Sequence, residues 1–64
     1  MVQINGEKKD VQGMALTAYL EQEGYQRGRI AIEYNEEILS KAEYEQTILR
    51  DGDVLEIVSF VGGG

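Results

Sequence analysis

A chain of 64 residues with no Cys and no His has few ways to become stable. It can form no disulfide, and it lacks the side chains that hold structural zinc. Folding at this size removes only about 60% of the unfolded chain's accessible surface from water, so regular secondary structure must enclose one compact core. Hydrophobic residues make up 42% of the sequence, which is enough for that core. We expect one small domain, and thiol and imidazole chemistry are excluded.

The charge balance restricts the partners of the chain. Twelve acidic and six basic residues give a formal net charge of −6. Nucleic-acid binding depends on Lys and Arg side chains that displace counterions from phosphates, so the balance argues against it and favours a protein partner with a basic face. No apolar stretch approaches the roughly 20 residues of a membrane-spanning helix, and no targeting segment is recognisable. We expect a soluble, cytoplasmic protein.

The first residues predict a hairpin. Val2 and Ile4 alternate with polar residues, and Asn5-Gly6 follows them as a strong turn signal. Residues 1–6 are therefore predicted to form a strand and a turn, paired antiparallel with a weaker strand over residues 7–11.

A helix is predicted within residues 14–24. Leu16, Tyr19 and Leu20 are spaced so that they share one helical face. Gly24 is a natural end, because glycine readily takes the left-handed conformation that stops helices.

The second half predicts further strands around a short helical turn. Residues 29–34 are rich in strand-forming side chains, and Ile38-Leu39 is a short apolar piece. Ser40 and Glu43 have the spacing of a capping box, which opens one short helical turn. Residues 54–61 form the longest strand-like run. The order predicts the α+β class, with one amphipathic helix laid across a mixed sheet.

The last predicted strand has two different faces. Leu55 and Ile57 are expected in the core, whereas Val58 and Phe60 have the opposite parity and face outward if the pleat is regular. An exposed Val58 and Phe60 would suit a docking patch for a partner. The alternative is a bulge or a curved sheet that buries both side chains.

The chain finishes on three consecutive glycines, Gly62, Gly63 and Gly64. Glycines add no side-chain packing and have the largest backbone entropy, so we expect a mobile tail. Such a tail could deliver the carboxylate of Gly64 into a narrow active site, since three extended residues span at most about 10 Å. The alternative is a frayed or engineered terminus without a function.

A carboxylate at Gly64 would need activation before it could react. A free α-carboxyl has a reference pKa of about 3.3–3.7, so at neutral pH it is an anion that resists nucleophiles. Nothing in the chain could catalyse the activation, which predicts a carrier and a substrate rather than an enzyme. The acidic pairs Glu36-Glu37 and Asp51/Asp53 lack regular metal-ligand spacing and are interpreted as surface turns. We therefore expect no bound metal or cofactor.

Several segments together resemble the ThiS family, the sulfur carriers of thiamine biosynthesis. They are the Asn5-Gly6 turn, the strand end at residues 32–35, the Asp-Gly-Asp turn with its strand at 51–58, and the end at 60–64. The resemblance implies the β-grasp, ubiquitin-like fold. It also implies a β-grasp domain over residues 1–61 and a flexible tail over residues 62–64.

The resemblance further implies a reaction cycle and its partners. An adenylyltransferase similar to ubiquitin-activating enzymes, of ThiF type, would use ATP to adenylate Gly64. Sulfur from a cysteine desulfurase would convert the adenylate to a thiocarboxylate, and a thiazole synthase of ThiG type would take that sulfur. The C-terminal diglycine of the family corresponds to Gly63 and Gly64. Gly62 extends it by one residue, and all three would enter the active sites of partners.

Three other functions remain open from the sequence. The chain could carry sulfur for molybdopterin synthesis or another pathway, because the glycines do not distinguish these uses. It could be a ubiquitin-like modifier whose Gly64 forms isopeptide bonds with lysines. It could also be a simple binding module that uses a strand edge or the face of Val58 and Phe60, with no role for the tail.

Overall fold

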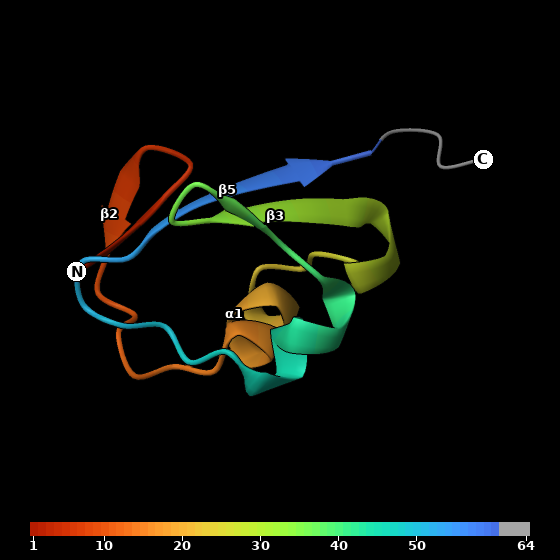
Figure 1. Ribbon diagram of the computed structural model, residues 1–64. Helices are drawn as coiled ribbons and strands as arrows, with labels where there is room; N and C mark the ends of the chain where they lie inside the picture. Colours follow the sequence, from red (N-terminus) through yellow and green to blue (C-terminus); the bar gives the residue numbers. More distant parts are fainter. Residues whose placement is uncertain (61–64) are drawn as a thin grey trace.

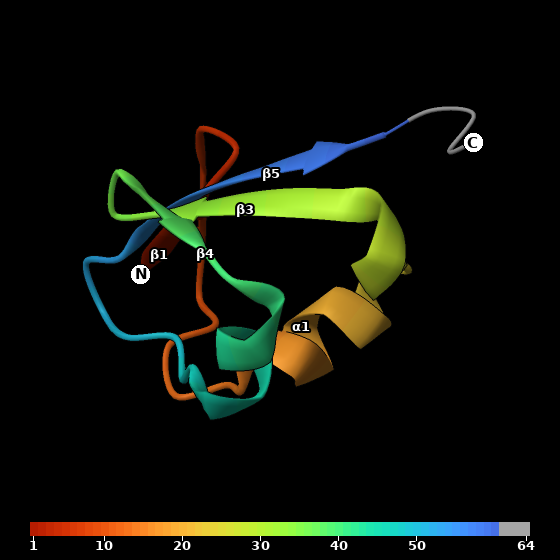
Figure 2. The same cartoon turned by 45° about the vertical axis from the view of Figure 1, so that its right-hand side comes forward.

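The structure is a computed structural model that describes residues 1–60. A five-stranded sheet in the order β2-β1-β5-β3-β4 has helix α1 laid across one face (Figure 1, Figure 2). β1 and β5 run parallel, and all other neighbours are antiparallel. The predicted α+β class and mixed sheet are confirmed. The elements are β1 (Val2–Ile4), β2 (Glu7–Lys9), α1 (Leu16–Gln22), the 3-10 helix η1 (Arg27–Arg29), β3 (Ile30–Tyr34), β4 (Glu37–Leu39), the 3-10 helix η2 (Lys41–Gln46) and β5 (Val54–Ser59).

The predicted hairpin at Asn5-Gly6 is confirmed, and its asparagine also binds β5. Asn5 and Gly6 have φ values of 51° and 83°, the left-handed conformation that a two-residue turn of this kind requires. The Asn5 amide then pairs with the backbone of Ile57, accepting its N–H at 2.7 Å and donating to its carbonyl at 3.2 Å. β2 is shorter than the predicted strand, because Val11 leaves the sheet and packs against the core.

Helix α1 lies inside the predicted range and stops at the predicted glycine. Gly24 has a φ of 80°, and its N–H donates to the Glu21 carbonyl at 3.1 Å. The next N–H, of Tyr25, reaches back to the Leu20 carbonyl at 2.9 Å. These two bonds form a Schellman motif, which satisfies carbonyl groups that the end of the helix would leave unpaired.

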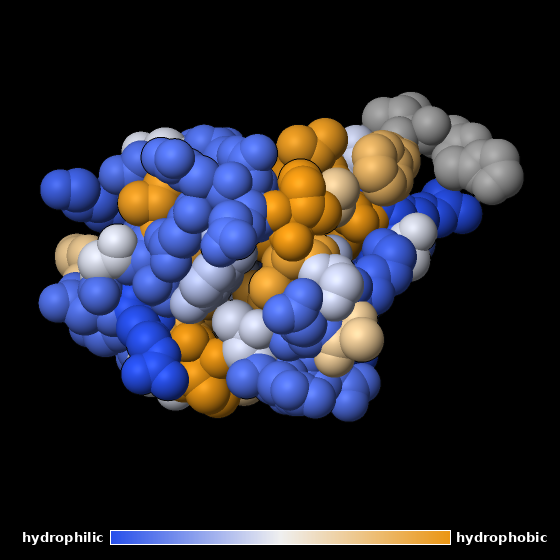
Figure 3. All heavy atoms as spheres, viewed as in Figure 1, coloured by the Kyte–Doolittle hydropathy of each residue, from blue (hydrophilic) through white to orange (hydrophobic). Residues whose placement is uncertain are grey.

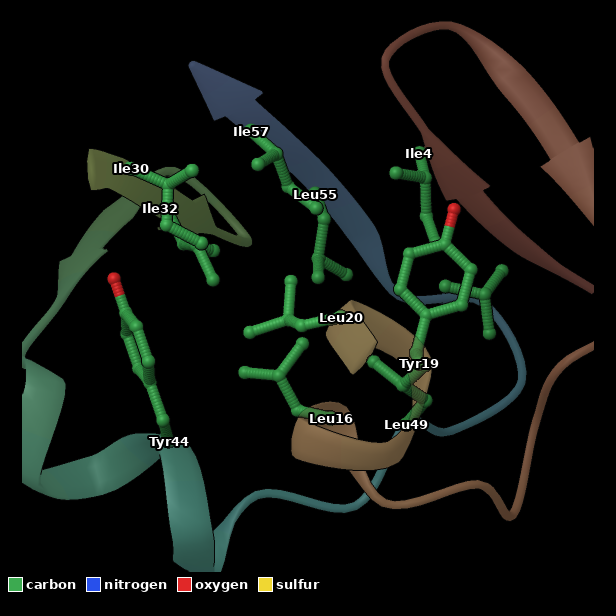
Figure 4. Packing of buried hydrophobic residues seen from close by; sticks show 11 residues of the cluster. Ile4, Leu16, Tyr19, Leu20, Ile30, Ile32, Tyr44, Leu49, Leu55 and Ile57 are labelled. Carbon is green, nitrogen blue, oxygen red and sulfur yellow. The ribbon is translucent and has the colours of Figure 1, made fainter. Parts of the chain in front are cut away.

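The inner face of the sheet and α1 enclose the hydrophobic core. Alternate side chains of β1, β3 and β5 point from the sheet toward α1 (Figure 4). Burial raises the pKa of the two core tyrosines, Tyr19 and Tyr44, because it disfavours the charged phenolate. The buried side chains are Val2, Ile4, Leu16, Tyr19, Leu20, Ile30, Ile32, Tyr44, Leu49, Leu55 and Ile57.

The capping box at Ser40 and Glu43 is confirmed, but the helix that it opens is longer than the single turn predicted. The Glu43 carboxylate accepts the Ser40 hydroxyl at 2.8 Å and the Ser40 backbone N–H at 3.3 Å. η2 continues to Gln46, where the Thr47 hydroxyl donates to the Glu43 carbonyl at 2.7 Å. β3 begins at Ile30, since Arg29 closes the short helix η1.

The strand predicted over residues 54–61 is β5, which ends at Ser59. Phe60 follows it outside the strand, and Val61 lies outside the described residues. The predicted boundary between a domain over residues 1–61 and a tail over residues 62–64 also lies outside the described residues, so it stays a prediction.

Candidate functional site

β5 is the central strand, and its outer face exposes the residues proposed for docking. Leu55 and Ile57 are buried against α1, whereas Val58 and Phe60 are 56% and 53% exposed. The predicted orientation of all four residues is confirmed. The alternative of a bulge that buries Val58 and Phe60 is wrong, because β5 pairs with β3 through five consecutive residue pairs.

The backbone remains tied to the fold one residue beyond β5. The Phe60 N–H donates to the Arg29 carbonyl at 2.8 Å. Lys41 supports this attachment from η2, because its ammonium donates to the carbonyl groups of Arg27 at 2.9 Å and Ile30 at 3.1 Å. Gly64 is the fourth residue after Phe60 in the sequence, and four residues span at most about 14 Å when fully extended.

The tail residues singled out by the sequence, Gly62, Gly63 and Gly64, lie outside the described residues. Their proposed entry into partner active sites therefore stays a prediction. The described part of the site is the outer face of the sheet at the end of β5.

This outer face carries an exposed residue that the sequence analysis did not assign to it. Ile38 is 75% exposed and lies in β4 opposite Glu33, which in turn lies opposite Glu56 of β5. Figure 3 shows hydrophobic side chains gathered over β5 and β3 toward the end of β5. The alternation of residues 30–34 could have indicated this face, but the pairing of β4 had to be known before Ile38 could be placed on it.

The opposite end of β5 is held by a polar network around Asp53. Its carboxylate accepts the Tyr34 hydroxyl, the Arg50 backbone N–H at 2.9 Å and the Asn35 amide at 3.2 Å. The Asn35 amide also accepts the Val54 N–H at 2.8 Å. These bonds close the β3–β4 turn onto the start of β5.

The network shifts the ionisation of two of its members. Burial, the hydrogen bond to Asp53 and the charge of Asp53 raise the pKa of Tyr34 to about 12. Burial alone would raise the pKa of Asp53, but the hydrogen bonds from Tyr34, Arg50 and Asn35 outweigh it and lower the pKa. The Asp53 carboxylate therefore has a structural role at neutral pH.

The acidic residues do not gather into a metal site. Among residues 1–60, no group of three or more His, Cys, Asp or Glu side chains could hold an ion. Within the same residues, no helix is long and apolar enough to cross a membrane.

A known family matches almost the whole chain. The profile of the ThiS family aligns with residues 2–64. The chain belongs to the ThiS family. The sulfur carrier protein ThiS of Thermus thermophilus is 39% identical over 64 residues, and the alignment covers all of both chains.

A second kind of relative is much longer than this chain. The thiazole synthase of Paramagnetospirillum magneticum is 44% identical over 62 residues, which are 95% of this chain but only 19% of that protein. A ThiS-like segment can thus form part of a longer protein that is named a thiazole synthase.

A solved structure supports the ThiS fold directly. The crystal structure of a thiamine biosynthesis protein (ThiS) from Geobacter metallireducens superposes with a TM-score of 0.74 at 28% identity. The superposition covers 98% of this chain and 97% of that one. The β-grasp fold implied by the sequence resemblance is confirmed.

Proposed function

We propose that this ThiS-family chain is a sulfur carrier protein of thiamine biosynthesis, and that the carboxylate of Gly64 carries the sulfur. The observation that carries the proposal is the full-length similarity to relatives named sulfur carrier protein ThiS, from Thermus thermophilus and Bacillus subtilis, each 39% identical. In this proposal the chain is a carrier and a substrate, and the catalytic groups belong to its partners.

The proposed chemistry activates Gly64 in two steps. A carboxylate oxygen of Gly64 attacks the α-phosphorus of ATP on an adenylyltransferase of ThiF type, and pyrophosphate leaves. A sulfur nucleophile at the oxidation level of sulfide, released from the persulfide of a cysteine desulfurase by a thiol reductant that becomes a disulfide, then attacks the acyl carbon. The C–S bond forms and AMP leaves with the electrons of the C–O bond. Activation is required because a free α-carboxyl, with a reference pKa of about 3.3–3.7, is an anion at neutral pH and resists attack by nucleophiles.

The structure supports delivery of Gly64 into an enclosed site. The backbone is fixed at Phe60, whose N–H binds the Arg29 carbonyl, and four residues, 61–64, follow it in the sequence. Those residues include Gly62 and Gly63, which lack Cβ atoms that could collide with the walls of a narrow channel.

The proposed partner surface lies beside Phe60, the last residue that the structure describes. Val58 and Phe60 expose apolar area beside the last strand, where an activating enzyme or a sulfur acceptor could dock. A thiazole synthase of ThiG type is the proposed acceptor. The Paramagnetospirillum thiazole synthase supports this choice, because part of its own chain is similar to this one.

Intact-protein mass spectrometry tests the proposal. The chain is incubated with ATP, a cysteine desulfurase with cysteine and a thiol reductant, and its adenylyltransferase. We expect a mass gain equal to the replacement of one oxygen by one sulfur, located at Gly64 by fragmentation. No gain, with the same enzymes active on another carrier, would contradict the proposal. Conjugates of high mass would instead indicate a protein modifier.

Gly64→Ala should slow the conversion without affecting the fold. We expect a rate loss of at least about tenfold, because a misplaced reacting group is costly in an enclosed site. The matched control is Gly28→Ala, since a Cβ at Gly28 would meet no atom within 4 Å. Both variants should unfold at the same denaturant concentration as the parent, and equal conversion rates would argue against delivery of Gly64.

A further inference from the structure

A shallow groove lies on the outer face of the sheet, between β3, β4 and β5. Its volume is about 140 Å³, and its rim includes Ile38 and Val58, which are 75% and 56% exposed. Ala31 lies directly opposite Val58 in the β3–β5 pairing. The lining residues are Ala31, Ile32, Glu33, Ile38, Glu56 and Val58.

Two like charges meet in this groove. Glu33 and Glu56 are direct partners in the antiparallel β3–β5 pairing, and both side chains are exposed. Like charges directly opposite one another destabilise a sheet. Within residues 1–60, the ion pairs involve Asp51 and Glu45, so no basic group lies within 4.0 Å of either glutamate. Neither glutamate is therefore paired with a basic group within the part of the chain that the structure describes.

We propose that this groove binds an apolar side chain of the thiazole synthase that is flanked by an Arg or Lys, whose charge bridges Glu33 and Glu56. The apolar side chain would cover Ile38 and Val58, and the cation would remove the repulsion between the carboxylates. The net charge of −6 also attracts the chain to a basic partner surface at long range. This inference rests on the proposed function, because it assigns a recognition chemistry to the docking face of the carrier.

A second copy of the chain does not fit the groove. In a symmetric dimer both subunits use the same surface, so the two grooves would bring four carboxylates together. Each chain also carries a net charge of −6, which adds long-range repulsion. The groove therefore fits a partner of opposite charge.

Calorimetric titration of the full chain with the thiazole synthase of the same organism tests the inference. The variant Glu33→Gln/Glu56→Gln keeps the shapes of the side chains and removes both charges. We expect the Kd to rise about tenfold at low salt, the combined effect of two exposed ion pairs. The dependence of the Kd on salt should become weaker. The control Glu21→Gln/Glu23→Gln removes the same charge from exposed positions at the end of α1, and should bind like the parent.

A second pair of variants tests the apolar part of the groove. Val58→Thr makes the groove more polar at nearly constant shape, and Val54→Thr does the same outside the groove on the same face of β5. We expect weaker binding for Val58→Thr and unchanged binding for Val54→Thr. Equal binding by Glu33→Gln/Glu56→Gln and the parent, or no binding by the parent, would overturn the inference. Conversion of the parent to the thiocarboxylate, measured in parallel, shows separately whether the proposed carrier function holds.

Discussion

The two ends of β5 are held in different ways. At its start, the Asp53 carboxylate accepts hydrogen bonds from Tyr34, Asn35 and Arg50, and side chains lock the strand in place. At its finish, the Phe60 attachment is a single backbone bond to Arg29, and the side chains of Val58 and Phe60 project into solvent.

The difference separates stability from recognition along one strand. Side chains at the start of β5 are engaged within the fold, so their loss should cost folding free energy. Outward-facing side chains near the finish have few partners within the fold, so they can change with little effect on folding. The exposed side chains at the end of β5 are thus available to bind a partner.

The largest expected change in the free energy of unfolding is the one that distinguishes the inner face of β5 from its outer face. Leu55→Ala removes a fully buried side chain and should lower the free energy of unfolding by about 2–5 kcal/mol. Val58→Thr changes an exposed side chain and should alter it by less than about 0.5 kcal/mol. Urea unfolding followed by circular dichroism measures both. A large loss for Val58→Thr would mean that the outer face also stabilises the fold.

A substitution at the start of β5 should lower the free energy of unfolding by a smaller amount, and this loss should depend on pH. Asp53→Asn should cost about 1–3 kcal/mol at pH 7, because hydrogen bonds to a charged group are lost. The pKa of Asp53 is lowered in the folded state, so its contribution is present above the unfolded pKa of about 3.9 and is lost as the pH falls through the folded value.

The measurement is the free energy of unfolding of both proteins between neutral and acidic pH. The difference between parent and Asp53→Asn should shrink as the solution becomes acidic. A difference that stays constant with pH would show that the network acts through shape and not through the charge of Asp53.

Much of this architecture could be predicted because local signals agreed with the fold. The Asn5-Gly6 turn, the Gly24 helix end and the Ser40–Glu43 capping box each depend on neighbours a few residues apart. The alternation in β5 placed Leu55 and Ile57 inside and Val58 outside. Each of these features follows from the chemistry of a short segment.

The missed features all depend on contacts between distant segments. The Asn5 and Asn35 amides bind the backbone of β5 at Ile57 and Val54, which the turn signals alone do not indicate. The opposition of Glu33 and Glu56 depends on the register between β3 and β5. Periodicity fixes which face a residue occupies but leaves the register open, so the groove could not be predicted.

The smallest expected effect concerns the attachment of Phe60. Lys41→Met removes the ammonium that binds the Arg27 and Ile30 carbonyls. If Lys41 holds η1 in place, the Phe60 amide should exchange with deuterium roughly fivefold faster, the loss of about one hydrogen bond. The control Lys8→Met changes an exposed lysine on β2 and should leave this rate unchanged. An unchanged rate in Lys41→Met would mean that the bond from the Arg29 N–H to the Gln26 carbonyl, at 2.9 Å, is sufficient to position η1.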